Sequence, residues 1–590
     1  MLSGMEALLD TLTPGSGVPG RPPTGATALL DALVACGVEV IFGYPGGAVL
    51  PLYDALHGEP RLRHVLVRHE QAAVHAAEGY ARSTGRLGVV FVTSGPGMTN
   101  TVTGLLDALC DSVPVLCIAG QVVTPLIGTG AFQECDGVGI ARPVTKWSCR
   151  LEDPDAVAAT VHRAAADALG GRPGPVLLEF PKDVQLAPAR LPEAAHRPGV
   201  VPAVLPLERL RAAAALISGA RRPAFYGGGG LVNSGPAACD AFTRLVRRTG
   251  APCTLTLMGL GALPASDPAF LGMLGMHGTI EANLAMHHAD VIVCVGARFD
   301  DRVTGDLARF SPNARKIHLD IDPSSIDRLV RVDVRLVGDC AALLAGLEQA
   351  MDEGSAGPAN LDAWWASIKR WKAQGCLRFG PRTDVILPQH LMRTLDGMVA
   401  GRDAIISTDV GQHQMWCAQY LAFERPNRWL TSGGAGTMGY GLPAALGAQV
   451  AHPDHLVVCV SSDASVQMNI QELSTAVQHK LPVKLILSNN GYMGMVRQWQ
   501  ELNHGSRYSH SYTAALPDFV ALAKAYGWSG RRVADPADLP DALRECLDSD
   551  GPFFLDVAVA ELSNCFPMIA AGAAHNQIMR DETTYYDAEL

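Results

Sequence analysis

The sequence predicts an α/β protein made of three domains, each a doubly wound parallel β-sheet. Short runs rich in Val, Leu and Ile alternate with Ala-rich helical stretches along most of the chain, which is the pattern of repeated β-α-β units. A chain of 590 residues is also too long for one hydrophobic core. A Pro-rich stretch at 186–206 and a Trp- and Lys-rich stretch at 361–374 separate the segments.

The first predicted domain covers residues 25–190 and follows a Pro- and Gly-rich tail at 1–24. The tail lacks the basic and apolar regions of a secretory signal, so we expect a flexible extension. The stretch "QAAVHAAEGYARSTG" has the pattern of a helix. Strands are expected at "EVIFG", "RHVLV", "LGVVFVT", "VPVLCIAG" and "GPVLLEF".

The second predicted domain covers residues 205–365, and the third covers residues 383–579. Strands of the second are expected at "RPAFYGGGG", "ADVIVCVGARF" and "KIHLDID". Strands of the third are expected at "DAIISTDVG", "HLVVCVS", "VKLILSNN" and "PFFLDVAV". The first and third domains share this organisation without a strict sequence repeat, which raises the hypothesis that they are related.

Composition and charge exclude several classes of protein. The chain is 48% hydrophobic, which is too apolar for a disordered protein, yet no long uninterrupted apolar run predicts a membrane span. The net charge of −11 comes without a compensating basic block, so we do not expect nucleic acid as a partner. The 14 cysteines are scattered and form no CxxC pair, which favours free thiols in a reducing cytoplasm.

A metal site is predicted at the stretch "VVCVSSDASVQMNIQEL" (457–473), where Asp463 follows a buried strand. The next strand ends at Asn489 and Asn490. Because the carboxyl ends of neighbouring parallel strands lie at one edge of a sheet, Asp463 and Asn490 are expected to converge there. Such hard oxygen ligands suit Mg²⁺, which shares its coordination shell with the phosphates of a substrate or cofactor. A helix starting near Ser465 would also attract those phosphates with its free N–H groups. The alternative is that Asp463 only caps a helix and Asn490 only makes a turn.

The pattern from Asp463 to Asn490 resembles the thiamine diphosphate (ThDP) fingerprint usually written GDG…NN. From about Thr24 to Met579 the chain resembles the large catalytic subunit of acetohydroxyacid synthase (acetolactate synthase). The motifs that carry the resemblance occur in order: "FGYPGGAVLPLYDAL", "RHEQAAVHAAEGYAR", "VTSGPGMTN", "AFQECD", "GRPGPVLLEFPKDV", "TLMGLGALP", "LGMHGT", "GARFDDRVTG", "STDVGQHQMW" and "GYGLPAALGA".

The resemblance implies a pyrimidine-binding domain, a central FAD-binding domain and a diphosphate-binding domain, with ThDP, Mg²⁺ and a structural FAD as cofactors. It implies that pyruvate is decarboxylated and that its two-carbon unit is joined to pyruvate or 2-oxobutanoate, in the synthesis of valine, leucine and isoleucine. Activity would require at least a homodimer, either as a dimer or within a tetramer. A small regulatory subunit is a further expected partner.

The resemblance also assigns roles to individual residues. Glu70 would hydrogen-bond the aminopyrimidine of ThDP, although an acid at a helix start is also explained by the helix dipole. Asp463, Asn490 and the backbone carbonyl of Tyr492 would hold Mg²⁺. Met438 would support the bent cofactor. The residues expected to contact ThDP are Val410, Gly411, Gln412, His413, Gly436, Met438, Ala464, Ser465 and Met495.

FAD and substrate contacts follow from the same resemblance. Arg302 would bind the carboxylate of the second 2-oxo acid, and Trp499 would form an apolar wall that favours 2-oxobutanoate. The expected FAD residues are Arg172, Gly228, Gly229, Thr256, Leu257, Met258, Gly275, Met276, His277, Gly278, Arg298 and Asp320. The expected channel residues are Gly47, Phe132, Gln133, Lys182, Arg302 and Trp499.

Two departures from the family pattern leave alternatives open. Ser462 and Ala464 replace the fingerprint glycines, so a catalytically weak or silent paralogue is an alternative to an active synthase. We expect ThDP and Mg²⁺ to bind more weakly than in a sequence with both glycines. The added Cβ would cost about 1 kcal/mol or more if the position requires φ > 0, and little if φ is ordinary. Ala570 and Ala571 also stand where the family often has proline. Another ThDP-dependent 2-oxoacid decarboxylase or carboligase is the second alternative.

Overall fold

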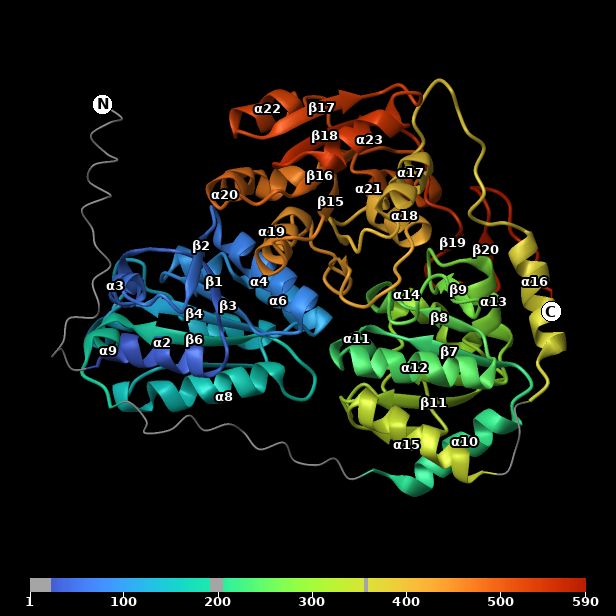
Figure 1. The fold of residues 1–590 in the computed structure, drawn as a ribbon, viewed down its shortest axis with the longest axis horizontal. Helices are drawn as coiled ribbons and strands as arrows, with labels where there is room; N and C mark the ends of the chain where they lie inside the picture. Colours follow the sequence, from blue (N-terminus) through green and yellow to red (C-terminus); the bar gives the residue numbers. More distant parts are fainter. Residues whose placement is uncertain (1–22, 191–204, 355–358, 590) are drawn as a thin grey trace. The chain divides into compact units, whose positions relative to one another are not determined.

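The computed structural model describes residues 23–190, 205–354 and 359–589. The chain divides into two compact units, one within residues 1–81 and 86–200 and the other within 82–85 and 201–590. The first unit contains one six-stranded parallel sheet, and the second contains two (Figure 1). Most of the predicted tail at 1–24 and of the predicted linker at 186–206 lies outside the described residues.

The sheet of the first unit has the strand order β2-β1-β3-β4-β6-β5, with all neighbours parallel. Its central strands are fully buried because both faces are covered by helices, and α2 packs against α3, α8 and α9. The strands are β1 Val40–Tyr44, β2 Arg63–Leu66, β3 Gly88–Val92, β4 Val115–Gln121, β5 Trp147–Arg150 and β6 Val176–Pro181. The helices are α2 Gly25–Ala35, α3 Leu50–His57, α4 Glu70–Thr84, α5 Pro96–Thr99, α6 Val102–Asp111, α7 Gly137–Ala141, α8 Val157–Leu169 and α9 Lys182–Leu186.

The central sheet has the order β12-β11-β10-β7-β8-β9. Counted from β7, this is the order 3-2-1-4-5-6 of dinucleotide-binding sheets, with its switch point between β7 and β10. The strands are β7 Pro223–Gly227, β8 Cys253–Leu255, β9 Phe270–Met273, β10 Val291–Val295, β11 Arg315–Asp320 and β12 Val334–Val337. The helices are α10 Leu207–Gly219, α11 Gly229–Asn233, α12 Pro236–Thr249, α13 Ile280–His288, α14 Asp301–Thr304, α15 Cys340–Glu353 and α16 Asp362–Ala373.

The third sheet has the order β14-β13-β15-β16-β18-β17. Counted from its own first strand, this order is the same as in the first unit, which supports the hypothesis that the two domains are related. The strands are β13 Ile405–Thr408, β14 Trp429–Leu430, β15 Val457–Ser462, β16 Lys484–Asn489, β17 Ser529–Val533 and β18 Phe553–Ala558. The helices are α17 Pro388–Val399, α18 Gln412–Tyr420, α19 Gly441–Ala451, α20 Leu473–Gln478, α21 Gly494–Asn503, α22 Phe519–Ala525 and α23 Leu539–Asp548.

A continuous hydrophobic core joins the second and third sheets into one unit. Helix α16 contributes to this core through Trp364 and Trp371, which are both buried and pack edge to face. The Trp-rich stretch between the two predicted domains is therefore a packed helix. After β18 the chain returns to the central sheet and forms a two-stranded antiparallel ribbon of β19 Met568–Ile569 and β20 Ile578–Met579.

Every strand expected from the sequence is present, and the three-domain α/β prediction is confirmed. The predicted helix over "QMNIQELSTAVQHK" differs, because its first part is a 3₁₀ segment at Val466–Glu472 and only Leu473–Gln478 is α-helical. Asn469 interrupts the regular backbone there, and its side chain donates to the Gly439 carbonyl at 2.7 Å. The sequence pattern therefore predicted a helical region here, but it did not predict that the first part is a 3₁₀ helix.

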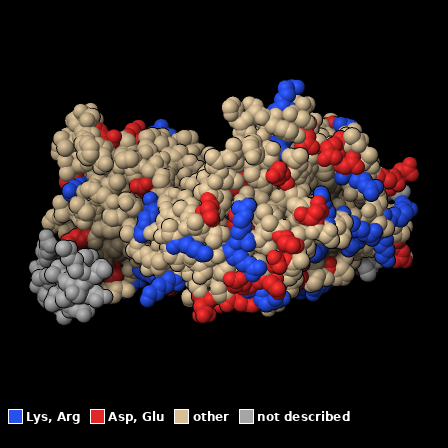
Figure 2. All heavy atoms as spheres, turned by 90° about the horizontal axis from the view of Figure 1, so that it is seen from above, with Lys and Arg blue, Asp and Glu red and all other residues tan. Residues whose placement is uncertain are grey.

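The face of the molecule drawn in Figure 2 carries both signs of charge. On the face drawn in Figure 2, Lys and Arg side chains lie among Asp and Glu side chains rather than gathering in one basic area. Among the helices that the structure describes, none combines the length and the apolar character needed to cross a bilayer.

Candidate active site

The carboxyl edge of the third sheet gathers the predicted metal ligands. Strands β15 and β16 are parallel neighbours in register from Val458 to Ser462, so Asp463 and Asn490 leave the sheet side by side. The Asn490 backbone lies close enough to the Asp463 carboxylate to lower its pKa, so the two loops meet. The topology therefore produces the convergence that the sequence predicted.

Asp463 is fully buried, and burial raises the pKa of its carboxyl group to about 6. The Thr513 hydroxyl donates to Oδ2 at 3.2 Å, whereas Oδ1 is buried without a hydrogen-bond partner among the described residues. The Asn490 side chain is also buried, and its Oδ1 accepts from the Tyr492 amide at 3.2 Å. A desolvated carboxylate with an open oxygen fits a cation, because a bound ion would offset the cost of burial.

The loop after β13 supplies a second set of open polar atoms at this edge. Gly411, with φ of +147°, precedes α18, whose first residues Gln412 and His413 are buried. Gln412 Oε1 and His413 Nε2 have no hydrogen-bond partner within the described chain. Desolvation lowers the pKa of His413 to about 3, so its imidazole is neutral. The edge therefore offers buried acceptor and imidazole groups to a polar ligand.

Asp409, at the end of β13, ties together the loops of this edge, although the sequence analysis did not select it. Its carboxylate accepts from the Gly439 amide at 2.6 Å and from the Ser461 hydroxyl at 2.8 Å. Gly439 follows Met438, so Asp409 fixes the Met438 loop against β15. Ser465 Oγ in turn donates to the Val410 carbonyl at 3.1 Å. An isolated Asp after a short strand carries no local signal of these contacts.

Helix α21 carries Met495 and Trp499 on one side, and side-chain contacts on its other side hold it in place. Arg497 is fully buried, pairs with Glu501 at 2.6 Å and donates to the Ser563 carbonyl at 2.6 Å. Gln498 Oε1 accepts from the side chain of Gln412 at 2.8 Å. These contacts fix the helix relative to the loop after β13.

We expect Arg497→Met to loosen α21, because it leaves the partly buried partners of the guanidinium unpaired. The loss should be about 3 to 5 kcal/mol. Hydrogen–deuterium exchange of the α21 amides should accordingly become at least about 100-fold faster. The matched variant Arg544→Met removes an exposed ion pair with Asp541 and should leave exchange in α21 unchanged. Equal exchange in both variants would show that the contacts of the Arg497 guanidinium do not hold the helix in place.

The carboxyl edge of the first sheet holds several predicted channel and catalytic residues. Glu70 is half-buried at the start of α4, and Asn100 donates to its Oε2 at 2.9 Å. Gly47 follows β1, and Lys182 follows β6. These residues come to one edge because the strands that precede them are parallel.

Phe132 and Gln133 lie in the loop after β4, and Phe132 is 88% exposed. Gln133 has a left-handed backbone with φ of +61°, which is uncommon for a residue other than glycine. Arg172 lies apart from this edge, in the loop that leads into β6, and donates to Ser112 Oγ at 2.8 Å and to the Leu109 carbonyl at 3.0 Å. Within the first unit, the structure therefore does not place Arg172 with the other predicted residues.

The carboxyl edge of the central sheet gathers the remaining predicted FAD residues. Gly228 follows β7 at the switch point, where a Cβ would come within 2.4 Å of the Gly296 carbonyl oxygen after β10. Such close packing of two strand ends requires glycine. The loops and strand ends at this edge hold Gly229, Thr256, Leu257, Met258, Gly275, Met276, His277, Gly278, Arg298 and Asp320.

The chain's C-terminal segment connects Arg302 to this edge. The Met276 amide donates to the Arg302 carbonyl at 2.9 Å, and the Ile569 amide donates to the Met276 carbonyl at 2.8 Å. The segment with Ala570 and Ala571 continues to Ala573, whose carbonyl accepts from Asp306 at 3.0 Å. The alanines therefore belong to a segment that is hydrogen-bonded at both ends.

Comparison with known proteins matches all three sheets to one class of enzyme. The family models described as thiamine pyrophosphate enzyme N-terminal TPP binding domain, central domain and C-terminal TPP binding domain match residues 23–140, 210–347 and 409–557. The chain is 45% identical over 564 residues to the acetolactate synthase large subunit of Haemophilus influenzae, covering 94% of this chain and 98% of that protein. It belongs to the acetolactate synthase large-subunit family.

Two Escherichia coli proteins are similar to the same extent. The large subunit of acetolactate synthase isozyme 3 is 45% identical over 571 residues, covering 95% of this chain and 99% of that protein. The large subunit of isozyme 2 is 44% identical over 555 residues, covering 94% and 99%. The resemblance that the sequence motifs indicated is confirmed. Membership of the acetolactate synthase family also indicates which class of ligand would bind the open polar atoms near Asp463.

Ser462 and Ala464, which depart from the family fingerprint, have backbones outside the left-handed region. The added Cβ atoms therefore strain neither backbone, which argues against the weaker cofactor binding that the sequence analysis predicts. Ser462 Oγ instead accepts from the Ser465 amide at 3.3 Å and donates to Ser465 Oγ at 3.1 Å. The serine caps the turn that follows Asp463.

The double variant Ser462→Gly/Ala464→Gly should bind ThDP with an affinity within about threefold of the natural chain, because neither backbone is strained by a Cβ. Titration of ThDP into apo-protein at saturating Mg²⁺ measures this. The single variant Ser462→Ala serves as the control, because it removes the cap but keeps the Cβ. A gain of more than about tenfold in the glycine variant would show that the two side chains obstruct the diphosphate.

Proposed function

We propose that the chain is the catalytic subunit of an acetolactate synthase. It decarboxylates pyruvate and joins the two-carbon unit to a second 2-oxo acid, either pyruvate or 2-oxobutanoate. The observation that carries the proposal is the buried Asp463 beside Asn490, with Oδ1 open to a cation, in a family whose relatives are named for this product. The pathway would be that of the branched-chain amino acids.

ThDP and Mg²⁺ fit the residues at the carboxyl edge of the third sheet. Asp463, Asn490 and the Tyr492 carbonyl would hold the metal. The diphosphate and pyrimidine would lie against the remaining residues assigned to ThDP, namely Val410, Gly411, Gln412, His413, Gly436, Met438, Ala464, Ser465 and Met495. When bound, ThDP supplies a carbon nucleophile and an electron sink for decarboxylation.

Glu70 is proposed to exchange a proton with the aminopyrimidine nitrogen of the cofactor. A half-buried carboxylate at the start of α4 can take this role as a general acid–base group. Asn100 orients the carboxylate through its hydrogen bond to Oε2. Met438 would support the cofactor from a loop that Asp409 holds in place.

The second 2-oxo acid is proposed to bind at Arg302 and Trp499. Arg302 is exposed, so its guanidinium is accessible to a carboxylate, and its Nη1 lies 3.9 Å from Met276 Sδ. The indole of Trp499 would form the apolar wall that favours the larger acceptor. Gly47, Phe132, Gln133 and Lys182 complete the proposed channel.

FAD is proposed as a structural cofactor at the central sheet, because that sheet has the strand order and the close-packed glycine loops of dinucleotide-binding domains. The ligation moves no net electrons, so the flavin would act through its binding. Arg172, His277, Arg298 and Asp320 are the proposed contacts beside the loops 228–229, 256–258 and 275–278.

The assembly and its setting remain part of the proposal. We assign residues 25–190, 205–365 and 383–579 to the three domains after a tail at 1–24. A homodimer or tetramer, a small regulatory subunit and a cytoplasmic location complete it, with neither nucleic acid nor a membrane as a partner. The names of the relatives as large subunits support the regulatory partner.

A colorimetric acetolactate assay tests the proposal directly. The purified chain receives pyruvate, ThDP, Mg²⁺ and FAD, and each component is omitted in turn. Acetolactate that depends on ThDP and Mg²⁺ is the expected result. Acetaldehyde or acetyl phosphate as the product would identify another ThDP enzyme, and no product with bound cofactors would identify a silent paralogue.

A further inference from the structure

The loop between β4 and α7, residues 122–136, is held by hydrogen bonds rather than by a hydrophobic core. None of its residues is buried, and none belongs to the apolar core of the first unit. The loop nevertheless carries Phe132 and Gln133, two residues of the proposed channel. An exposed loop of this kind keeps one conformation only where polar contacts fix it.

Glu134 gathers the tip of this loop. Its carboxylate accepts from three backbone amides that precede it, namely those of Gly128, of Gly130 at 2.9 Å and of Ala131 at 3.1 Å. Oε1 accepts from Gly128, and Oε2 accepts from the other two amides. The tip is therefore wrapped around one carboxylate, and both of its oxygens are used.

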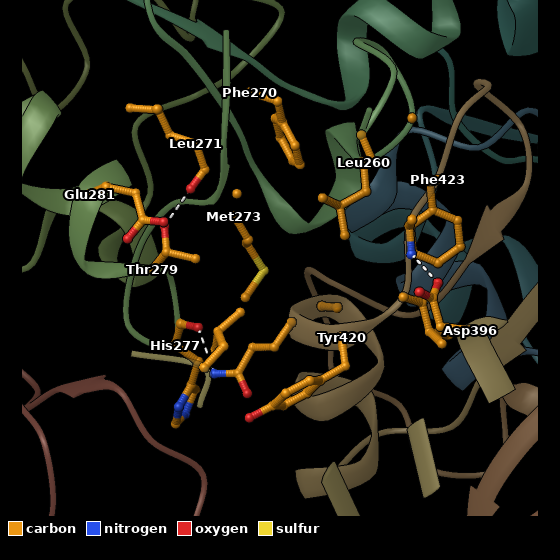
Figure 3. Close-up of a pocket in the computed structure, with 18 of the residues that line it drawn as sticks. Leu260, Phe270, Leu271, Met273, His277, Thr279, Glu281, Asp396, Tyr420 and Phe423 are labelled. Atoms are coloured by element: carbon orange, nitrogen blue, oxygen red, sulfur yellow. Dashed lines mark hydrogen bonds between the residues drawn. The ribbon is translucent and has the colours of Figure 1, made fainter. Parts of the chain in front are cut away.

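The hydrogen bonds to Glu134 favour its ionised form. The amide of Gly128, followed by the other two amides, lowers the pKa of the Glu134 carboxyl group. Glu281 shows the opposite behaviour: it lies in the wall of the cavity drawn in Figure 3, and desolvation raises the pKa of its carboxyl group. Glu134 therefore acts as an anion at neutral pH, and its bonds to the loop are charge-assisted.

The two ends of the loop are fixed separately, by residues of β6 and α9. At the first end, Asp183 Oδ1 accepts from the Thr124 amide at 3.0 Å and from its hydroxyl at 3.2 Å. At the second end, Gln121 Nε2 donates to the Cys135 carbonyl and to the buried Glu179 carboxylate, each at 2.8 Å. These contacts do not reach the tip, so the conformation of the tip depends on Glu134.

The tip sets the direction of Gln133. Its backbone is left-handed, with φ of +61°, and it lies against Gly95, where a Cβ would come within 2.7 Å of the Gln133 carbonyl oxygen. A residue other than glycine keeps such a conformation only where the surrounding contacts impose it. Glu134 is the next residue in the chain, so its three hydrogen bonds support the backbone at this position.

We infer that Glu134 is a positioning residue for substrate binding, which holds the loop so that Phe132 and Gln133 are presented to the substrate in one arrangement. It touches no reacting atom. The inference rests on the proposed function, which assigns Phe132 and Gln133 to the channel. Loss of Glu134 weakens substrate binding and leaves ThDP binding unchanged, because none of the residues assigned to ThDP lies in this loop.

Glu134→Ala, measured in the full chain loaded with its cofactors, tests the inference with two readouts. Hydrogen–deuterium exchange of the amides at 128–131 should become at least about tenfold faster. The KM for pyruvate should rise at least about fivefold, with ThDP affinity within about twofold of the natural chain. The thermal midpoint should stay within about 2 °C, because the substitution removes no core contact.

Two further variants separate the role of the carboxylate from a general effect. Glu134→Gln should fall between Glu134→Ala and the natural chain in both readouts, because one amide oxygen replaces two carboxylate oxygens. Glu152→Ala is the matched control, because Glu152 is exposed between β5 and α8 of the same unit, and it should change neither readout.

Each outcome decides one part of the inference. Unchanged exchange at 128–131 in Glu134→Ala would overturn it, because the carboxylate would then not hold the loop. Faster exchange with an unchanged KM would also overturn it, because the loop would then not serve the substrate. A natural chain that forms no acetolactate would instead refute the proposed function, and the exchange measurement would still decide whether Glu134 holds the loop.

Discussion

The variant Asp463→Asn should lose Mg²⁺-dependent ThDP binding and, with it, acetolactate formation. Replacing the buried carboxylate with a neutral amide removes the strongest metal ligand from a site where Oδ1 has no other partner. We expect the apparent ThDP affinity in Mg²⁺ to fall on the order of 10³-fold. Titration of ThDP into the apo-variant, with and without Mg²⁺, measures both parts of this loss.

Asp454→Asn is the matched control for Asp463→Asn. Asp454 is exposed and precedes β15, so the same substitution is made at the opposite end of the same strand. Its cofactor affinity should match that of the natural chain. ThDP binding by Asp463→Asn that still depends fully on Mg²⁺ would place the metal elsewhere.

Glu70→Gln should retain ThDP and lose turnover. Glutamine keeps an oxygen that can accept from Asn100, so the geometry at the start of α4 is preserved, but it cannot exchange a proton with the cofactor. We expect a decrease of about 10² to 10⁴-fold in kcat, with ThDP affinity within about threefold. The rate at which the bound cofactor exchanges its acidic proton for deuterium should fall in parallel.

Glu39→Gln provides the comparison for Glu70→Gln. Glu39 is exposed, pairs with Arg86 at 2.6 Å and precedes β1, at the amino edge of the same sheet. Its turnover should stay within about twofold of the natural chain. Normal proton exchange in Glu70→Gln would assign the proton transfer to another group.

Ser462 and Ala464 put no strain on the backbone, so only the contacts of their side chains could impair an active synthase. Neither residue has positive φ, and the serine hydroxyl caps the next turn. The fingerprint glycines are therefore not required by the local conformation of this chain. This favours an active enzyme over a silent paralogue.

The sequence by itself predicted the strands that lie inside the three sheets, except β8, and the residues that follow them. Strands such as β4 and β15 are buried on both faces, so they appear as continuous apolar runs. Asp463 and Asn490 could be placed at one edge because each follows such a run, whereas the role of Glu70 came from the family resemblance. The motifs then indicated the cofactor class, which the matched families confirm.

The sequence analysis missed β8, the ribbon strands β19 and β20, and five of the six edge strands of the three large sheets, namely β5, β9, β12, β14 and β17. Edge strands are short or partly exposed, so they lack a continuous apolar pattern, and β12 alternates buried and exposed residues.

Tertiary structure alone decided which polar groups meet. Asp409 contacts Gly439, Thr513 contacts Asp463, and Arg497 contacts the Ser563 carbonyl. Each pair is separated by many residues along the chain, and each partner alone resembles an ordinary turn or surface residue. Local sequence determines strands and turns because their forces act between neighbours, whereas these contacts exist only after the sheets bring distant loops to one edge.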